Sequence, residues 1–316
     1  MITNFDQIFE LLRSKSRKRL VAAWAVDDHT ITAAYKAVEL GIVDATLVGD
    51  TEKIMEVCKL ENLDPAKFTI VHNDNELKSI AQAVEMVRNG EGDILMKGLC
   101  STDKYMRGIL NKEKGLLPPK AVLSHVCVLQ NPNYHKLVVL GDMAVIPLPD
   151  LKQKIAIAKY LVDTAKALDI AKPKLAIIAA TEQMLEGMPA CVDAAIISKK
   201  VDRGEIPGCV ADGPLALDVA ISKEAVEIKK LASPVAGDAD CLLFPNIESA
   251  NVFYKVNSQL CVGVKQAAIV AGAMAPCVLS SRADSIDTKL NSVYPLDQNG
   301  NHQYGTPPPN SEHSPA

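Results

Sequence analysis

The chain has few aromatic residues and lacks the glycine motifs that mark two large classes of nucleotide-binding enzyme. Phe, Trp and Tyr make up 4% of its 316 residues. No Gly-x-Gly-x-x-Gly follows an expected strand, and no Gly-x-x-x-x-Gly-Lys-Ser/Thr occurs. These absences weaken an interpretation as a Rossmann dehydrogenase or a P-loop enzyme, although other modes of binding an adenine-containing cofactor stay open.

Membrane and nucleic-acid partners are also disfavoured. No apolar run approaches the ~20 residues that a transmembrane helix needs. The net charge is −4, and Lys and Arg do not gather into the long basic patch of a nucleic-acid scaffold. Met1 leads directly into a polar and apolar helix pattern without the features of a signal peptide. We therefore expect a cytoplasmic protein with no membrane or nucleic-acid partner.

Cysteine is present, but not in a metal-binding or disulfide pattern. The chain has 8 Cys residues, with no Cys-x-x-Cys and no zinc-like spacing with His. Most of them lie in apolar runs, as Cys241 does before Leu-Leu-Phe. We expect buried free thiols in a reducing compartment, and no metal site.

The chain does contain a regular alternation of short apolar strands and amphipathic helices. Such alternation predicts an α/β fold with a parallel sheet and right-handed crossovers. We expect strands over residues 19–24, 44–49, 69–72, 93–96, 121–129, 137–146, 174–180, 194–198, 241–244 and 277–279. We expect helices over residues 5–12, 32–40, 52–61, 76–89, 151–168, 254–273 and 286–293.

The length favours two lobes, because 316 residues exceed one comfortable domain. Pro147, Pro149 and Asp150 mark the expected first crossing, and the strand at 277–279 should return to the first lobe. We therefore predict a discontinuous first lobe (1–148 plus 275–295) and a second lobe (149–274). Residues 296–316 are polar and Pro-rich, which predicts a disordered tail.

Asp93–Thr102 reads as a strand that ends in Lys-Gly and is followed by hydroxyl residues and a helix carrying Arg107. A Gly at a strand end lets the backbone approach a ligand, and Lys97, Ser101 and Thr102 have the chemistry to hold an anion. The alternative is a strand-to-helix turn in which Ser or Thr only caps the helix.

Ser281-Arg282 follows an expected strand and precedes an expected helix. Backbone amides, a positive helix end and a fixed guanidinium suit a phosphate or an acyl phosphate. The alternative is a helix cap formed by Ser280 or Ser281, with Arg282 paired to Asp284 or Asp287 at the surface.

Three further polar positions in the second half have plain structural alternatives. Asp212 precedes Gly-Pro, which is typical of a tight turn. Asn246 and Asn251 follow an expected strand, with Lys255 on the helix beyond, and a capping role is the alternative there. His125 and His135 flank an apolar region, and we expect both to be structural histidines rather than bases or ligands.

Taken in order along the chain, these segments resemble the phosphate acetyltransferase/phosphate butyryltransferase family. The matching pieces are residues 41–49, Met96-Lys-Gly98 with Ser101-Thr102, Asp212-Gly-Pro-Leu-Ala-Leu-Asp218, Val235-Ala-Gly237, Phe244-Pro245 with Asn251 and Tyr254-Lys255, and Ser281-Arg282. The butyryl branch is the more similar, because Ser281-Arg-Ala-Asp-Ser285 precedes Asp287-Thr-Lys289. Where the family usually has Asp and Gly, this chain has Asn246 and Ala250.

The resemblance implies a two-lobed α/β/α fold like that of isocitrate and isopropylmalate dehydrogenases, with the active site in the cleft. It implies the reaction acyl-CoA + phosphate ⇌ acyl phosphate + CoA, with coenzyme A as a substrate, no tightly bound cofactor, and a homodimer or higher homo-oligomer. In the acetyl branch a catalytic Asp occupies the position of Thr288, which follows Asp287 here.

On that basis we expect direct transfer in a ternary complex. Asp287, or secondly Asp284, would accept the thiol proton, because the thiolate is the nucleophile. Ser281 would donate to the oxyanion. The expected phosphate site is Arg282 with Arg107, Lys97, Ser101 and Thr102, and the expected CoA and acyl site is Asp212, Asn246, Asn251 and Lys255.

Three alternatives stay open from the sequence. The first is the same chemistry on an acetyl group, since one methylene is worth only ~1–3 kcal/mol of discrimination. The second is an NAD-dependent dehydrogenase on the same fold. The third is a non-catalytic protein that binds acyl phosphates.

Overall fold

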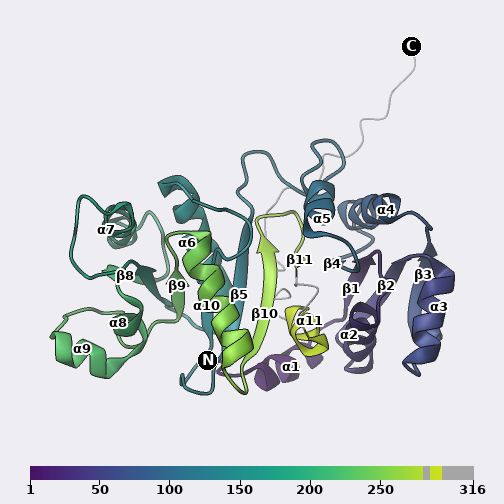
Figure 1. Ribbon diagram of the computed structural model, residues 1–316, viewed down its shortest axis with the longest axis horizontal. Helices are drawn as coiled ribbons and strands as arrows, with labels where there is room; N and C mark the ends of the chain where they lie inside the picture. The colour runs from purple at the N-terminus through teal and green to yellow at the C-terminus, as the bar shows by residue number, and fades with distance from the viewer. Residues whose placement is uncertain (280–284, 294–316) are drawn as a thin grey trace, which may run out of the picture.

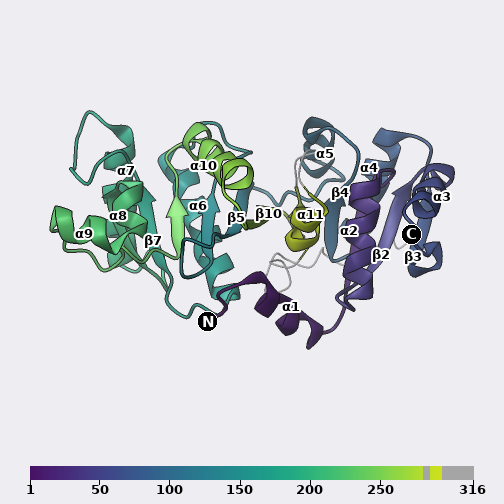
Figure 2. The same ribbon diagram turned by 60° about the horizontal axis from the view of Figure 1, so that its bottom comes forward.

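A single long β-sheet with helices on both faces organises the computed structural model (Figures 1 and 2). The structure describes residues 1–279 and 285–293, and within these ranges eleven strands pair in the order β3-β2-β1-β4-β11-β10-β5-β6-β9-β7-β8. The strands are β1 (Lys18–Ala23), β2 (Val43–Gly49), β3 (Phe68–His72), β4 (Ile94–Lys97), β5 (Ser124–Gln130), β6 (Val138–Gly141), β7 (Lys174–Ile178), β8 (Val210–Leu215), β9 (Cys241–Leu243), β10 (Lys265–Ala271) and β11 (Cys277–Val278).

Helices follow most of the strands, although β5 leads directly to β6 and β10 directly to β11. They are α1 (Phe5–Arg13), α2 (Asp28–Glu39), α3 (Thr51–Leu60), η1 (Pro65–Lys67), α4 (Glu76–Arg88), α5 (Thr102–Ile109), α6 (Leu151–Ala167), α7 (Pro189–Asp202), α8 (Leu217–Ile221), α9 (Lys223–Lys229), α10 (Ile247–Leu260) and α11 (Ile286–Ser292). Side-chain caps start many of them, because the first backbone N–H groups of a helix have no partner inside it. Asp50, Ser101 and Asp150 are examples.

Strand direction divides the sheet into two halves. β3, β2, β1, β4 and β11 run parallel to one another, and β6, β9, β7 and β8 form a second parallel set. Between the sets, β10 is antiparallel to both β11 and β5, and β5 is antiparallel to β6. The chain thus returns beside β4 through β11, while the division into lobes at 148 and 275 stays a prediction.

The buried apolar residues form one shared core on one face of the sheet and two separate cores on the other. The shared core joins the two halves through α1, α2, α3, α6, α7 and α11. On the opposite face, α4 and α5 cover the first half, and α8 and α10 cover the second. Because these two cores are separate, the central strands between them are the natural place for a cleft.

Two predicted elements are wrong. Residues 194–198 were expected as a strand, but they lie in α7, where Cys191, Ala194, Ile197 and Val201 are buried at helical spacing. Residues 254–273 were expected as one helix, but α10 ends at Leu260 and the Ala-rich run continues as β10. Gly263, with φ +76°, lies in the turn between them. Runs of Ala, Ile and Val fit both periodicities, so tertiary packing decides.

The Asp212-Gly-Pro segment is also not the tight turn that we expected, because it lies inside β8. A side chain at Gly213 would place its Cβ 2.7 Å from Cβ of Ile177 on β7. The glycine therefore serves close packing between neighbouring elements.

The predicted burial of free thiols is confirmed for most of the cysteines: all 8 are free, and each is buried except Cys261, which is partly exposed. Among the described residues, no helix is both long and apolar enough to cross a membrane.

Candidate active site

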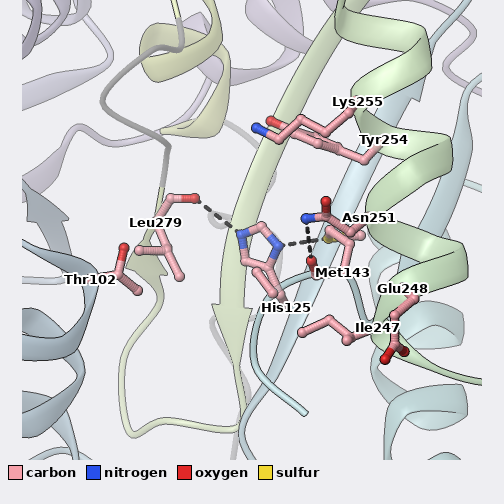
Figure 3. A pocket seen from close by; sticks show the side chains of 10 residues that line it. Thr102, His125, Met143, Ile247, Glu248, Asn251, Tyr254, Lys255 and Leu279 are labelled. Carbon is pink, nitrogen blue, oxygen red and sulfur yellow. Dashed lines mark hydrogen bonds between the residues drawn. The ribbon is translucent and has the colours of Figure 1, made fainter. Parts of the chain in front are cut away.

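A pocket of about 440 Å³ opens between α10 and the N-terminus of α5 (Figure 3). It draws on both halves of the sheet and on segments that are far apart in sequence. Its lining residues are Thr102, His125, Met143, Ala144, Ile247, Glu248, Asn251, Tyr254, Lys255 and Leu279. Three of the predicted site residues, Thr102, Asn251 and Lys255, are therefore brought together here.

One face of α10 forms a wall of the pocket. Asn246 caps this helix by accepting from the backbone N–H of Ser249 at 3.0 Å, so its side chain serves the helix start. Asn251, one turn further on, donates from Nδ2 to the backbone carbonyl of Met143 at 3.0 Å. Lys255 Nζ lies 5.3 Å from the centre of the Tyr254 ring, close enough for a cation–π contact.

His125 lines the floor of the pocket, and sequence reasoning missed it. It is buried at the start of β5, with Nε2 3.1 Å from the carbonyl oxygen of Leu279. Its Nδ1 faces the sulfur of Met143 at 2.6 Å. The only sequence signal was a polar residue at the head of an apolar strand, which does not by itself indicate which face the side chain occupies.

The loop after β6 carries Met143 and Ala144 into the pocket and was also missed. The buried carboxylate of Asp142 accepts from three backbone N–H groups, those of Ala144, Val145 and Ile146, at 2.8, 2.9 and 3.2 Å. These hydrogen bonds form within the loop, so they hold its backbone in place without contacts from other elements.

Lys97 and Leu279 lie side by side at the ends of neighbouring strands. β11 pairs with β4 through Cys277 with Leu95 and Val278 with Met96, so the next position along sets Leu279 beside Lys97. Lys97 is 2% exposed, and its Nζ donates to the carbonyl of Gly98 at 3.4 Å. A buried ammonium at a strand end beside a pocket has the chemistry of an anion site.

Gly98 packs closely against the backbone at the end of β1. A Cβ there would lie 2.2 Å from the backbone oxygen of Trp24, and the Gly98 N–H donates to Ala23 at 2.9 Å. The backbone at the end of β1 therefore occupies the space where a side chain would begin. Ser101 caps α5 by accepting from the N–H of Lys104 at 3.2 Å.

The other predicted residues lie outside the lining. Arg107 is largely exposed and pairs with Asp103 at 3.1 Å. Asp212 accepts from the N–H of Gly213 at 2.8 Å. Asp287 is exposed and pairs with Lys36 of α2 at 3.5 Å. Ser281, Arg282 and Asp284 lie outside the described residues, although Leu279 brings the chain to the pocket just before them.

A helix cap at Ser280 or Ser281 was the alternative expected for this segment. The residue that caps α11 is Ser285, which accepts from the N–H of Thr288 at 3.1 Å.

Cys100 is the nearest cysteine along the chain to Lys97. Burial raises the pKa of its thiol to about 11, although the charge of Lys97 lowers it. The Cys100 thiol is therefore neutral at physiological pH and a poor nucleophile.

The comparisons agree with this geometry. Residues 71–294 match the family model described as Phosphate acetyl/butaryl transferase. The phosphate butyryltransferase of Clostridium acetobutylicum is 43% identical over 93% of this chain and 97% of that protein, and the phosphate acetyltransferase of Thermotoga maritima is 37% identical over 91% and 97%. A branched-chain phosphotransacylase from Enterococcus faecalis V583 matches with a TM-score of 0.78 at 28% identity, covering 89% of this chain and 98% of that chain.

The chain belongs to the phosphate acetyl/butyryl transferase family, and it is an acyltransferase. The α/β/α fold implied by the resemblance is confirmed, with the pocket between its two halves.

Proposed function

We propose that the protein transfers an acyl group, preferably butyryl, between coenzyme A and phosphate: acyl-CoA + phosphate ⇌ acyl phosphate + CoA. The observation that carries the proposal is the pocket itself, where Thr102, Asn251 and Lys255 meet next to the strand that leads into Ser281-Arg282. The relatives named as butyryl and acetyl transferases support the reaction class, and the higher identity of the butyryl relative supports the acyl preference.

Transfer proceeds directly within a ternary complex. In the direction of acyl-CoA synthesis, the CoA thiolate attacks the carbonyl carbon of the acyl phosphate, the C–S bond forms, and the C–O bond to phosphate breaks. Ser281 donates a hydrogen bond to the oxyanion that develops on the carbonyl oxygen. Arg282 and Lys97 stabilise the leaving phosphate, with Thr102 at the pocket edge.

A carboxylate accepts the proton of the CoA thiol, because a free thiol with a pKa of ~8.5 is mostly protonated at neutral pH. Asp287 and Asp284 are the candidates. The carboxylate of Asp287 is engaged by Lys36 and lies outside the pocket lining, which favours Asp284. Arg107 pairs with Asp103 at the surface and does not line the pocket, so we leave it out of the phosphate site.

The CoA portion of the site is proposed to use Asn251 and Lys255. The ammonium of Lys255 can pair with a phosphate or lie near a carbonyl of the pantetheine arm. Asn246 caps α10, and Asp212 lies in β8 and bonds the N–H of Gly213. We therefore propose that both support the site without contacting CoA. This chemistry requires no tightly bound cofactor, and we propose a homo-oligomer as the working assembly.

The test is a thiol-release assay with phosphate and a series of acyl-CoA substrates from acetyl to valeryl. We expect release of CoA that depends on phosphate, with the highest kcat/KM for butyryl-CoA. Highest activity with acetyl-CoA would replace the butyryl assignment by the acetyl one. Binding of acyl phosphate without any thiol release would contradict the catalytic proposal.

A further inference from the structure

We infer that Met143 is a specificity-determining residue, whose side chain sets the length of acyl chain that the pocket accepts. The inference rests on the proposed acyl transfer. We define the apolar wall as Met143, Ala144 and Ile247, which line the pocket on the side of the second half of the sheet. No motif in the sequence pointed to this wall.

The polar groups next to the apolar wall are engaged with one another. The Asn251 amide donates to the Met143 carbonyl, and the His125 Nε2 bonds the Leu279 carbonyl, while Nδ1 faces the Met143 sulfur. Figure 3 shows this series of contacts running across the floor of the pocket. A hydrocarbon chain has no polar groups to satisfy, so it fits such a wall better than the amide-rich pantetheine arm does.

The position of Met143 is fixed from two sides. Its backbone is held by Asn251 and by the Asp142 carboxylate, which binds the next three N–H groups of the loop. Its side chain packs so closely that the residue is only 1% exposed. A methionine in open space adapts to its ligand, but one held in this way acts as a stop.

The proposed stop is tested by shortening the side chain. Met143→Ala removes three heavy atoms from the wall and should admit a longer chain. Since one methylene in an apolar pocket changes discrimination by about tenfold or more, the ratio of kcat/KM for hexanoyl-CoA to that for butyryl-CoA should rise at least about tenfold. Met143→Leu, which keeps the volume, should leave the ratio within about twofold of the wild type.

The matched control is Leu148→Ala. Leu148 lies in the same loop but is 76% exposed and is not part of the pocket lining, so its truncation should leave the ratio unchanged. A change of equal size in this control would mean that the loop as a whole, and not the wall, sets the preference, and would overturn the inference.

A second variant decides the matter if Met143→Ala does not fold, as judged by circular dichroism. Ala144 is exposed and lines the pocket, so Ala144→Leu adds bulk to the wall without opening a core cavity. It should favour acetyl-CoA over butyryl-CoA by at least about tenfold relative to the wild type. If the variants are folded and active but keep the wild-type preference among acyl-CoA substrates, the proposed role of Met143 is overturned and the proposed function is not. If the wild type releases no thiol in the presence of phosphate, the proposed function is overturned as well.

Discussion

The imidazole Nε2 of His125 lies 3.1 Å from the carbonyl oxygen of Leu279. The two residues come from β5 and from the end of β11, which are separated by β10 in the sheet. Because a carbonyl can only accept a hydrogen bond, Nε2 must carry the proton in this contact. The contact ties the floor of the pocket to the strand that leads toward Ser281.

His125→Phe should therefore weaken both the fold and the reaction. Loss of this buried hydrogen bond should lower the free energy of unfolding by about 1–3 kcal/mol, measured by urea denaturation. We also expect a larger fold-change in kcat than in the KM for CoA. The reason is that the end of β11 is displaced, whereas α10, which lines the other side of the pocket, is kept. His125→Gln retains an N–H donor and should recover most of the loss. Equal behaviour of the Phe and Gln variants would argue against the hydrogen bond.

Lys97 gives a test that separates catalysis from stability. Lys97→Met keeps the length of the side chain and removes a charge that is 2% exposed. Because Lys97 is proposed to stabilise the leaving phosphate, loss of its ammonium should lower kcat/KM for phosphate at least about tenfold. A drop in melting temperature with unchanged phosphate kinetics would assign Lys97 a purely structural role.

The two arginines of the predicted phosphate site form a matched pair. Arg282→Gln should raise the KM for phosphate and lower kcat, by about 100-fold or more in kcat/KM, because a charged contact to the leaving phosphate is lost. Arg107→Gln should change kcat/KM by less than about threefold, since Arg107 is an exposed partner of Asp103. Steady-state kinetics with varied phosphate measures both. A large loss in the Arg107 variant would restore it to the site.

Asp284 and Asp287 are distinguished in the same way. Asp284→Asn should lower kcat by about 100-fold or more if it accepts the thiol proton. Asp287→Asn should cost less than about tenfold, because this exposed carboxylate pairs with Lys36 at the surface. Assays over a range of pH are informative, since a lost base makes the rate follow the ionisation of the thiol itself. The reverse order of losses would make Asp287 the base.

Much of the fold was predictable because strands and helices alternate with clear boundaries in the first half. Gly41 and Gly90 close helical turns, and Asp50 caps the helix that follows β2. The errors at α7 and β10 share one cause. Segments rich in Ala, Ile and Val satisfy both the helical and the strand period, so only the packing of neighbouring elements decides between them.

Part of the pocket lining was predictable from polar residues after a strand and from the family resemblance. Thr102 follows a strand end, and Asn251 and Lys255 belong to the segments that resemble the family; all three line the pocket. His125 and Met143 were missed because their importance depends on which face of the sheet β5 presents and on how the loop after β6 folds over Asp142. Neither property is encoded in a local pattern of residue types.

An ion cluster lies where β6, β7 and β9 begin, at the opposite ends of these strands from the loop that carries Met143. Asp238 is 2.7 Å from the ammonium of Lys174, 3.0 Å from that of Lys136 and 2.8 Å from the Nε2 of His135. Burial alone would raise the pKa of the Asp238 carboxyl, but hydrogen bonds from Lys174 and Lys136 together bring it well below its usual range. The folded protein thus binds this proton less readily than the unfolded chain does.

Stability should therefore decline in acid as Asp238 becomes protonated. The contribution of this carboxylate is present above about pH 4, the ordinary range for Asp, and is lost progressively at lower pH. Asp238→Asn should lower the free energy of unfolding at pH 7 and flatten its dependence between about pH 5 and pH 3, as measured by urea denaturation at stepped pH. Asp169→Asn is the control, because that carboxylate is 78% exposed in its pair with the Met1 amine. If the Asp238 variant keeps the acid slope of the wild type, other carboxylates carry the acid sensitivity.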